Sequence, residues 1–362
     1  MTKLAPRAVS KLVYTDLETA VNPCKVYNMK LRANSFLMGL LIVVSGLPAI
    51  SFAQSIASLS LANRQSVLNG RASFSFPTDA VNSARPTDIM SADHNINQET
   101  RVVLDIKKKR LVFFAQDVYA VSDKSALTNK LAETDKNNKM NSKVLVDNAE
   151  IFAILSTPTE FDSKQTAILV NRLTIKSSDN SVFIVEAYIN SESYSKREEF
   201  KSLTQKVFQS IKAGNRVVKR EAHVETYDIF GSNIKIKIKL PPNYIVNVDQ
   251  KYDFQVFKFI RYTDFGSTGR NTFIVYFGRH PSYLFKNFDF SKGQAKELQG
   301  DFLSQKINWL LFGDNEKKIY IKEQQMPLNN ADGLIVHVGM LTKNESSLAE
   351  LTKIANDIEL VK

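Results

Sequence analysis

The chain carries the same order of sequence patterns twice, and this recurrence constrains its fold more than any other feature. In each half a short alternating segment is stopped by proline, in "FSFP" from Phe74 and in "IKLPP" from Ile238, because proline cannot donate to a strand ladder. A long apolar segment comes near the end of each half, at residues 182–189 and 333–341. We therefore predict two copies of one module of about 140 residues, a usual domain size.

Each apolar segment is followed by a stretch with helical periodicity. Its apolar residues recur at intervals of three and four positions, which is the spacing of one face of an amphipathic helix. These residues are Phe200, Leu203, Val207, Phe208 and Ile211 in the first half, and Leu348, Leu351, Ile354, Ala355 and Ile358 in the second. Each module is therefore predicted to end in a helix that packs on one face.

Hairpins and further helices are predicted in the interior of both modules. Residues 100–106 and 110–121 flank a lysine-rich turn, and two apolar runs joined by a short polar loop predict an antiparallel hairpin. The same pattern predicts a hairpin from residues 254–262 and 271–279, and helical patterns fit residues 125–136 and 293–306. The sequence thus predicts an α+β fold: two tandem modules, each a mostly antiparallel sheet packed with helices.

Loops and composition set the predicted boundaries. Residues 77–100 are rich in Pro, Asp, Asn and Ser and are predicted to form a long loop. The basic stretch that follows the first terminal helix is predicted to be a linker. The predicted segments are 1–28, an extension; 29–53, a signal peptide; 54–70, a weakly ordered lead; 71–214, the first module; 215–224, the linker; and 225–362, the second module.

Residues 29–53 have the three-part layout of a secretory signal peptide. Lys30 and Arg32 precede an apolar run at residues 36–47, and small residues follow up to Ala53, where a signal peptidase would cleave. A membrane anchor requires about 20 apolar residues, which is longer than this run. The pattern therefore favours an export signal over a transmembrane anchor.

Cleavage between Ala53 and Gln54 would leave 309 residues with a net charge of +7, compared with +11 for the full sequence. The product is expected to be a periplasmic or secreted bacterial protein without a transmembrane anchor. The residues before Met29 indicate a misassigned start codon, with a genuine extension as the alternative. Because the only cysteine, Cys24, precedes the cleavage site, the exported chain has no disulfide and no thiol-based site.

The order of elements also resembles that of a known family. A strand ending in "FP" or "LP", a hairpin, a middle helix, more strands and a last helix ending near "QSI" or "NDI" is similar to the PsbP-like fold, over residues 66–214 and 225–362. That family includes the extrinsic photosystem subunit and many small exported bacterial proteins. The resemblance implies an antiparallel sheet sandwiched by helices and a binding or assembly role. It assigns no functional residue, because no site motif matches.

The sequence offers little for catalysis. The four histidines His94, His223, His280 and His337 do not have the spacing of a zinc motif, and neither the hydrolase motif G-x-S-x-G nor a phosphate-binding loop is present. We expect no metal and no cofactor. His337 lies in an apolar segment and is interpreted as structural. His280, in "GRHPS", and Asp264, in "DFGSTG", are the two candidates for an unrecognised catalytic site.

Two basic groups are candidates for binding a partner or an anionic surface. In the strand "IKIKIKL" the lysines alternate with apolar residues, so they share one face. This pattern indicates an edge strand or a sheet with one open face, where lysines commonly prevent edge-to-edge pairing. The candidates are Lys107, Lys108, Lys109 and Arg110 in the hairpin turn, and Lys235, Lys237 and Lys239 in the alternating strand.

The leading hypothesis from the sequence is an exported, non-enzymatic binding or assembly protein. Its partner would be an envelope or extracellular protein, bound across an open sheet face or in the cleft between the modules. The alternatives are a secreted hydrolase and a binder of anionic envelope surfaces. Aromatic and basic residues alternate near Phe257 and Lys258, as on a surface that stacks single-stranded nucleic acid. The export signal favours a protein core instead, so no specific nucleic-acid binding is expected.

Overall fold

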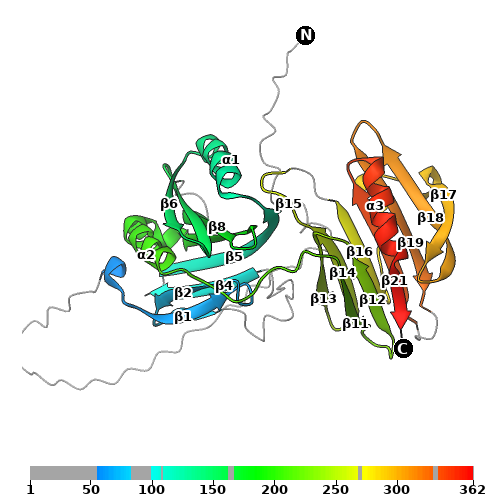
Figure 1. The fold of residues 1–362 in the computed structure, drawn as a ribbon, viewed down its shortest axis with the longest axis horizontal. Coiled ribbons are helices and arrows are strands. Elements are labelled where there is room, and N and C mark those ends of the chain that lie inside the picture. The colour runs from blue at the N-terminus through cyan, green and yellow to red at the C-terminus, as the bar shows by residue number, and fades with distance from the viewer. Residues whose placement is uncertain are drawn as a thin grey trace, which may run out of the picture. The chain divides into compact units, whose positions relative to one another are not determined.

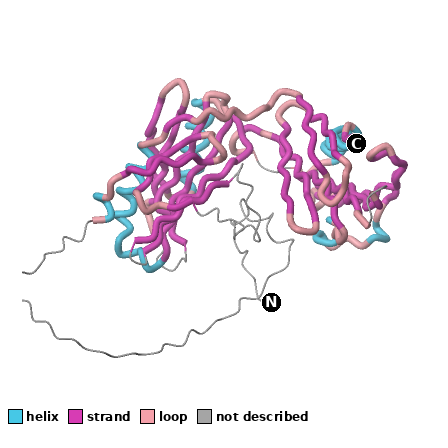
Figure 2. Tube along the Cα trace, turned by 90° about the horizontal axis from the view of Figure 1, so that it is seen from below, coloured by secondary structure: helices cyan, strands magenta, loops and turns pink. Residues whose placement is uncertain are grey.

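Strands dominate the computed structural model, as Figure 1 and the magenta segments of Figure 2 show. Within the described ranges there are 21 strands and three α-helices, and neighbouring strands are almost all antiparallel. The predicted α+β class is therefore wrong, because the protein is mostly β. The structure describes residues 55–82, 99–106, 109–161, 167–267, 271–328 and 333–361.

The first part of the described chain forms two sheets. Its strands are β1 (Leu61–Val67), β2 (Ala72–Pro77), β3 (Val81–Asn82), β4 (Glu99–Ile106), β5 (Lys109–Val121), β6 (Met140–Asp147), β7 (Ile151–Pro158), β8 (Ala167–Ser177), β9 (Ser181–Asn190) and β10 (Lys212–Ala213). Its helices are η1 (Ile56–Ser58), α1 (Lys124–Asn137), η3 (Ser191–Lys196) and α2 (Arg197–Gln209). The small sheet has the order β1-β2-β10, and the large sheet has the order β3-β4-β5-β9-β8-β7-β6.

The second part also forms a small and a large sheet. Its strands are β11 (His223–Asp228), β12 (Lys235–Leu240), β13 (Tyr244–Gln250), β14 (Phe254–Arg261), β15 (Thr263–Asp264), β16 (Thr272–Gly278), β17 (Lys296–Phe302), β18 (Gln305–Asp314), β19 (Ile319–Pro327), β20 (Ile335–Thr342) and β21 (Ile358–Val361). Its helices are η4 (Leu284–Phe288), η5 (Lys292–Gln294) and α3 (Glu345–Asn356). The orders are β11-β12-β21 and β13-β14-β16-β20-β19-β18-β17, while β15 joins the first large sheet beside β5.

The two parts repeat one strand order. β1, β2 and β10 correspond to β11, β12 and β21, and the two large sheets correspond strand by strand along their whole order. In both parts an α-helix, α2 or α3, precedes the last strand. This recurrence supports the predicted duplication, while the module boundaries remain a prediction. The lead predicted as weakly ordered contributes η1 and β1, and β1 belongs to the first small sheet.

Several local predictions are confirmed. β4 pairs antiparallel with β5, and β14 pairs antiparallel with β16, as the hairpin patterns indicated. The helix predicted at residues 125–136 is α1, and its N-cap Asp123 accepts the N–H of Ala126 at 2.7 Å. α2 and α3 bury the apolar residues predicted for them up to Phe208 and Ala355. The last residue of each predicted stripe lies beyond its helix: Ile211 follows α2, and Ile358 begins β21.

The helix predicted at residues 293–306 is wrong, and this error contributes to the wrong fold class. The segment contains the whole of β17 and the start of β18. It contains two glycines, which favour neither helix nor strand interiors. At Gly300 an added Cβ would lie 2.8 Å from Nε1 of Trp309. The close approach of the two strands therefore depends on glycine, which a pattern of apolar positions does not reveal.

Each part has its own main core between its small sheet, its large sheet and its last helix. In the first core, Phe74, Phe76, Phe113 and Phe208 pack with ring centroids 5.1 to 6.2 Å apart. The second core contains Trp309 and the apolar face of α3. The other face of each large sheet has a smaller cluster, under α1 in the first part and under η4 in the second.

Two observations concern the export prediction. The extension, the signal peptide and the cleavage position between Ala53 and Gln54 lie outside the described residues. Among the helices that the structure describes, none combines the length and the apolar character needed to cross a bilayer.

Candidate functional site

The two residues proposed for catalysis do not form a site together. Asp264 is an exposed residue of β15, and His280 is an exposed residue that follows β16. Within the described part of the chain, the side chain of neither residue makes a hydrogen bond or an ion pair; the backbone of His280 is hydrogen-bonded to the Tyr276 side chain. His94 lies outside the described residues.

His337 is a structural residue, as its apolar setting indicated. Its Nε2 lies 2.8 Å from Oε2 of Glu323, and the side chains of the two residues are 2% and 0% exposed. The Glu323 carboxylate also accepts the backbone N–H groups of Leu284 at 2.7 Å and Phe285 at 2.8 Å. The His337–Glu323 pair therefore connects the η4 segment to β19 and β20, and it is buried away from solvent.

The basic candidates are largely paired on the surface. Arg110 Nε lies 3.1 Å from Asp105 Oδ1, and hydrogen bonding to Asp105 raises the pKa of Arg110. Lys237 and Lys239 both contact Glu359, at 3.1 Å and 2.6 Å. Lys235 lies 3.6 Å from Asp228. Lys109 is half-buried, and Lys107 and Lys108 lie outside the described residues.

β12 is not an edge strand, which corrects the first of the two interpretations of "IKIKIKL". It lies between β11 and β21. The second interpretation is confirmed, since Ile236, Ile238 and Leu240 are buried while Lys235 and Lys239 are exposed. Edge and open-face strands share the same alternation, so the pattern alone does not separate them.

A bulge in β5 directs a tyrosine away from its sheet. The register with β9 shifts between Asp117 and Ala120, and Tyr119 has a left-handed backbone with φ of 48°. Bulges change the direction of a side chain at functional positions and strand ends. Here the Tyr119 hydroxyl accepts a hydrogen bond from Asn247 Nδ2 at 2.9 Å, and its ring meets that of Tyr262 edge-on at 5.9 Å.

The Asp117 carboxylate connects the same elements. Its Oδ2 accepts hydrogen bonds from Arg71 Nη1 and from the Tyr262 hydroxyl, each at 2.5 Å, and its Oδ1 accepts the N–H of Tyr119 at 2.7 Å. Burial and the Asp117 charge raise the pKa of Tyr262, which keeps its hydroxyl protonated and donating. We call Arg71, Asp117, Tyr119, Asn247 and Tyr262 the tyrosine clamp.

The residues after Tyr262 extend the contact made by the tyrosine clamp. β15 pairs in parallel with the end of β5, with Thr263 opposite Ala120. The N–H of Phe265 donates to Val121 O at 2.9 Å, and the Phe265 ring packs on the apolar cluster under α1. Hydrogen bonds, a strand pair and an apolar contact thus join the same two segments.

The linker is fixed to the β1–β2 turn at its start. The N–H of Gly214 donates to Arg71 O at 3.0 Å, and the N–H of Arg216 donates to Gly70 O at 3.1 Å. A Cβ on Gly214 would lie 1.8 Å from Gly70 O, so no other residue fits there. Further along, Asp179 Oδ2 accepts the N–H of Val218 at 2.9 Å.

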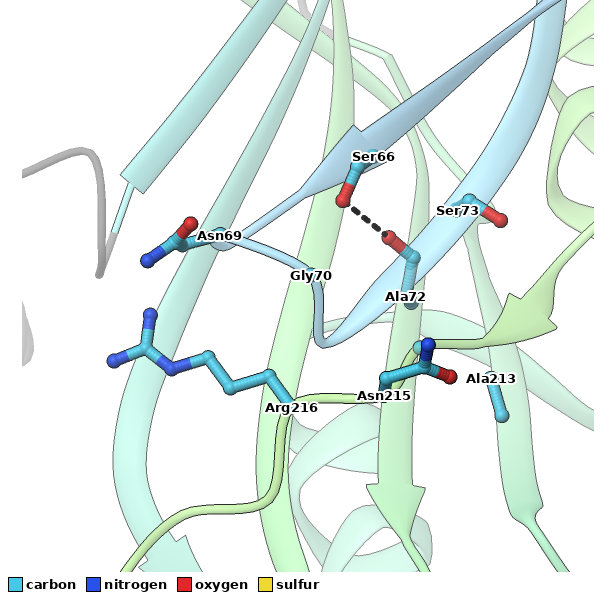
Figure 3. A pocket seen from close by; sticks show the side chains of 9 residues that line it. Ser66, Asn69, Gly70, Ala72, Ser73, Ala213, Asn215 and Arg216 are labelled. Carbon is cyan, nitrogen blue, oxygen red and sulfur yellow. Dashed lines mark hydrogen bonds between the residues drawn. The ribbon is translucent and has the colours of Figure 1, made fainter.

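Two hollows flank this linker, and Arg216 lines both. A hollow of about 510 Å³ lies over the β1–β2 turn, and Figure 3 shows Ser66, Ser73, Asn69 and Asn215 around it. The second, which we call the linker cavity, has a volume of about 160 Å³. Its polar lining consists of Arg71, Asp117, Arg216, Lys219, His223, Glu225, Asn247 and Tyr262.

Two apolar side chains of this region are exposed. Val217 lines the linker cavity, whereas Val224 stands between the cavity-lining His223 and Glu225 on β11 and therefore points to the opposite face of the small sheet. Val217 is 64% exposed and Val224 is 52% exposed, and they are two of only six large hydrophobic residues that are exposed in the described ranges. Val224 lies on β11, which pairs with β12 on one side and with no described strand on the other. We call the linker cavity, Val217 and the outer edge of β11 the linker site.

The linker site is basic. Residues 212–240 contain seven lysines and arginines against three carboxylates, a net charge of +4. This one stretch therefore holds more than half of the +7 expected for the exported chain. Among the residues that the structure describes, no group of three or more His, Cys, Asp or Glu is placed to hold a metal ion.

Comparison with known proteins adds no assignment. Neither the protein-family models nor the curated proteins nor the solved structures give a match to this chain. The PsbP-like resemblance accordingly stays a prediction. The geometry of the linker site is then the basis for assigning a function.

Proposed function

We propose that the protein is an exported, non-enzymatic binding protein that engages an envelope or extracellular protein through the linker site. The observation that carries this proposal is the exposure of two apolar side chains: Val217 lines the linker cavity, and Val224 lies on the outer face of β11, which has no described strand on its outer edge. Exposed apolar residues bordered by polar groups are characteristic of protein-binding surfaces.

The tyrosine clamp supports a binding role because it gives the linker site a fixed shape. A rigid surface loses less conformational entropy when a partner binds. Arg71 and Asp117 are almost completely buried, with side-chain exposures of 2% and 6%. Arg71 also donates to Ser181 at 2.7 Å and lies over the ring of Phe183 at 4.6 Å.

The same contacts distinguish Asp117 from a catalytic carboxylate. Both of its oxygens accept hydrogen bonds, and one of these bonds comes from a guanidinium. A general base must instead present a free lone pair to its substrate. We therefore assign Asp117 to positioning the linker site, and the secreted hydrolase gains no support from His280 or Asp264.

The binder of anionic surfaces is retained as the second candidate function, because of the net charge of +4 in residues 212–240. Attraction of this kind needs no specific partner and weakens as salt screens the charges. A protein partner is favoured over a bare anionic surface because Val217 and Val224 would remain exposed to water on contact with ions alone.

The proposal is tested by site-specific cross-linking in intact cells. A photoreactive phenylalanine analogue is placed at position 224 in one strain and at position 144 in another. Val144 is the matched control, since it is also 52% exposed and lies on another edge strand, β6. We expect one recurrent envelope protein on position 224 and none on position 144. Equal capture at both positions, or capture at neither, would refute the proposal.

A further inference from the structure

We infer that the partner enters the linker site as an extended, acidic segment that adds a strand to the outer edge of β11. This inference rests on the proposed function and specifies the partner's chemistry. Binding by strand addition combines main-chain hydrogen bonds with side-chain contacts at alternate positions.

The backbone of β11 is suited to strand addition. It pairs with β12 over six consecutive residues, from His223 opposite Leu240 to Asp228 opposite Lys235, without a register shift. An edge strand of this kind has unpaired N–H and C=O groups at regular intervals. Only another peptide backbone can match such a row, which favours a protein segment over a lipid or a free anion.

Other edges in the described structure are less suited. β6 carries a register shift between Val144 and Val146, and β1 carries one between Leu61 and Asn63. Such irregularities obstruct edge pairing. β13 is engaged by the tyrosine clamp through Asn247. β17 is regular and, like β11, carries two carboxylates, but its neighbour β18 has one lysine where β12 has three. An acidic segment would therefore meet less positive charge at β17.

The side chains around β11 define the expected sequence of the partner. Val224 and Thr226 lie opposite Lys239 and Lys237 on the exposed face of the small sheet. The residue of the partner segment that packs beside the Val224 side chain should therefore be apolar. Because strands lie about 4.8 Å apart, the lysine row is about 10 Å from an added strand. A glutamate can extend toward these lysines. Within the described residues, they and Lys235 form ion pairs with two carboxylates, Asp228 and Glu359.

The linker supplies further positive charge at one end of β11. Lys219 lines the linker cavity and makes no ion pair within the described residues. Arg220 reaches the backbone oxygen of Asp179, so it adds charge without neutralising a carboxylate. An acidic side chain near the His223 end of the added strand would therefore meet a cationic cavity mouth.

The test uses three synthetic ten-residue peptides and the purified exported chain. The first alternates valine and glutamate, the second alternates valine and lysine, and the third is the first peptide with N-methyl groups on alternate residues. N-methylation keeps the charge and the side chains but removes the hydrogen bonds of one strand edge. Binding is measured by fluorescence anisotropy at low and high salt.

We expect the valine–glutamate peptide to bind at least tenfold more tightly than the other two, and less tightly as salt rises. It should also slow amide hydrogen exchange in residues 223–228 and leave β6 unchanged. Equal affinity for the methylated peptide would overturn strand addition, and equal affinity for the lysine peptide would overturn the acidic preference. Binding of phosphatidylglycerol vesicles in place of the peptide would overturn the inference in favour of a membrane surface.

The two proposals fail separately. If position 224 captures an envelope protein while the valine–glutamate peptide does not bind, the proposed function holds and strand addition is wrong. If the peptide binds as expected while position 224 captures nothing in cells, β11 accepts strands but the proposed function is wrong.

Discussion

Removing one hydroxyl from the tyrosine clamp tests whether this cluster holds the structure together. In Tyr262→Phe the ring remains and only the hydrogen bond to Asp117 Oδ2 is lost. A hydrogen bond to a charged group contributes about 1.5–3 kcal/mol. Arg71 still neutralises Asp117 after the substitution, which places the expected loss at about 2 kcal/mol of unfolding free energy.

The measurement is urea unfolding of residues 54–362, followed by circular dichroism at neutral pH. Tyr252→Phe is the matched control, because Tyr252 is 81% exposed and its hydroxyl should contribute less than about 0.5 kcal/mol. A Tyr262→Phe variant as stable as the control would refute the reasoning, since it would show that the hydroxyl makes no buried bond to Asp117.

The pH dependence of the same variant gives a second readout. Burial and Asp117 raise the pKa of Tyr262 in the folded protein above its unfolded value of about 10. The associated stability is present below pH 10 and is lost as the pH rises toward the folded pKa. The wild type should therefore lose stability above pH 10 more steeply than Tyr262→Phe. Parallel curves would contradict the assigned hydrogen bond.

Three further substitutions test the linker and the second core, all by urea unfolding. Gly214→Ala should lower the unfolding free energy by more than about 2 kcal/mol and speed proteolysis of the linker, because the added methyl group would collide with Gly70 O. Gly293→Ala is the control and should have neither effect, because no atom lies within 4 Å of the added methyl group. Lys322→Met should raise the unfolding free energy by about 1 kcal/mol. Burial lowers the pKa of this lysine, which contacts the Thr352 hydroxyl and the Trp309 ring. A lower unfolding free energy in the variant would contradict this prediction. Leu351→Ala should cost about 2–5 kcal/mol, because Leu351 is 1% exposed in the second core, and a loss below 1 kcal/mol would contradict that assignment.

Local patterns were sufficient to predict the terminal helices and hairpins. The apolar spacing of α2 and α3 and the alternation around the β4–β5 turn are set within a few residues of chain. The prediction at residues 293–306 failed because the decisive contact, Gly300 against Trp309, comes from strand pairing. Counting that segment as helix, when strands make up most of the described chain, contributed to the wrong α+β class.

The linker site was only partly accessible from sequence. The linker itself and its positive charge were visible as a basic, polar stretch between apolar patterns. The tyrosine clamp was not, because Arg71 and Asp117 are 46 residues apart and Asp117 and Tyr262 are 145 apart. No periodic pattern relates positions at that separation. A bulge such as the one at Tyr119 has no signature in a strand of ordinary composition.

The most direct test of the central claim measures how one added charge at the linker site changes partner affinity. The protein captured by the cross-linker at position 224 is purified, and its binding to Val224→Asp and Val144→Asp is compared with its binding to the wild type. Both residues are 52% exposed, so both variants should fold equally well. We predict at least tenfold weaker binding for Val224→Asp and unchanged binding for Val144→Asp. Equal affinities for the two variants would contradict the assignment of the linker site as the binding surface.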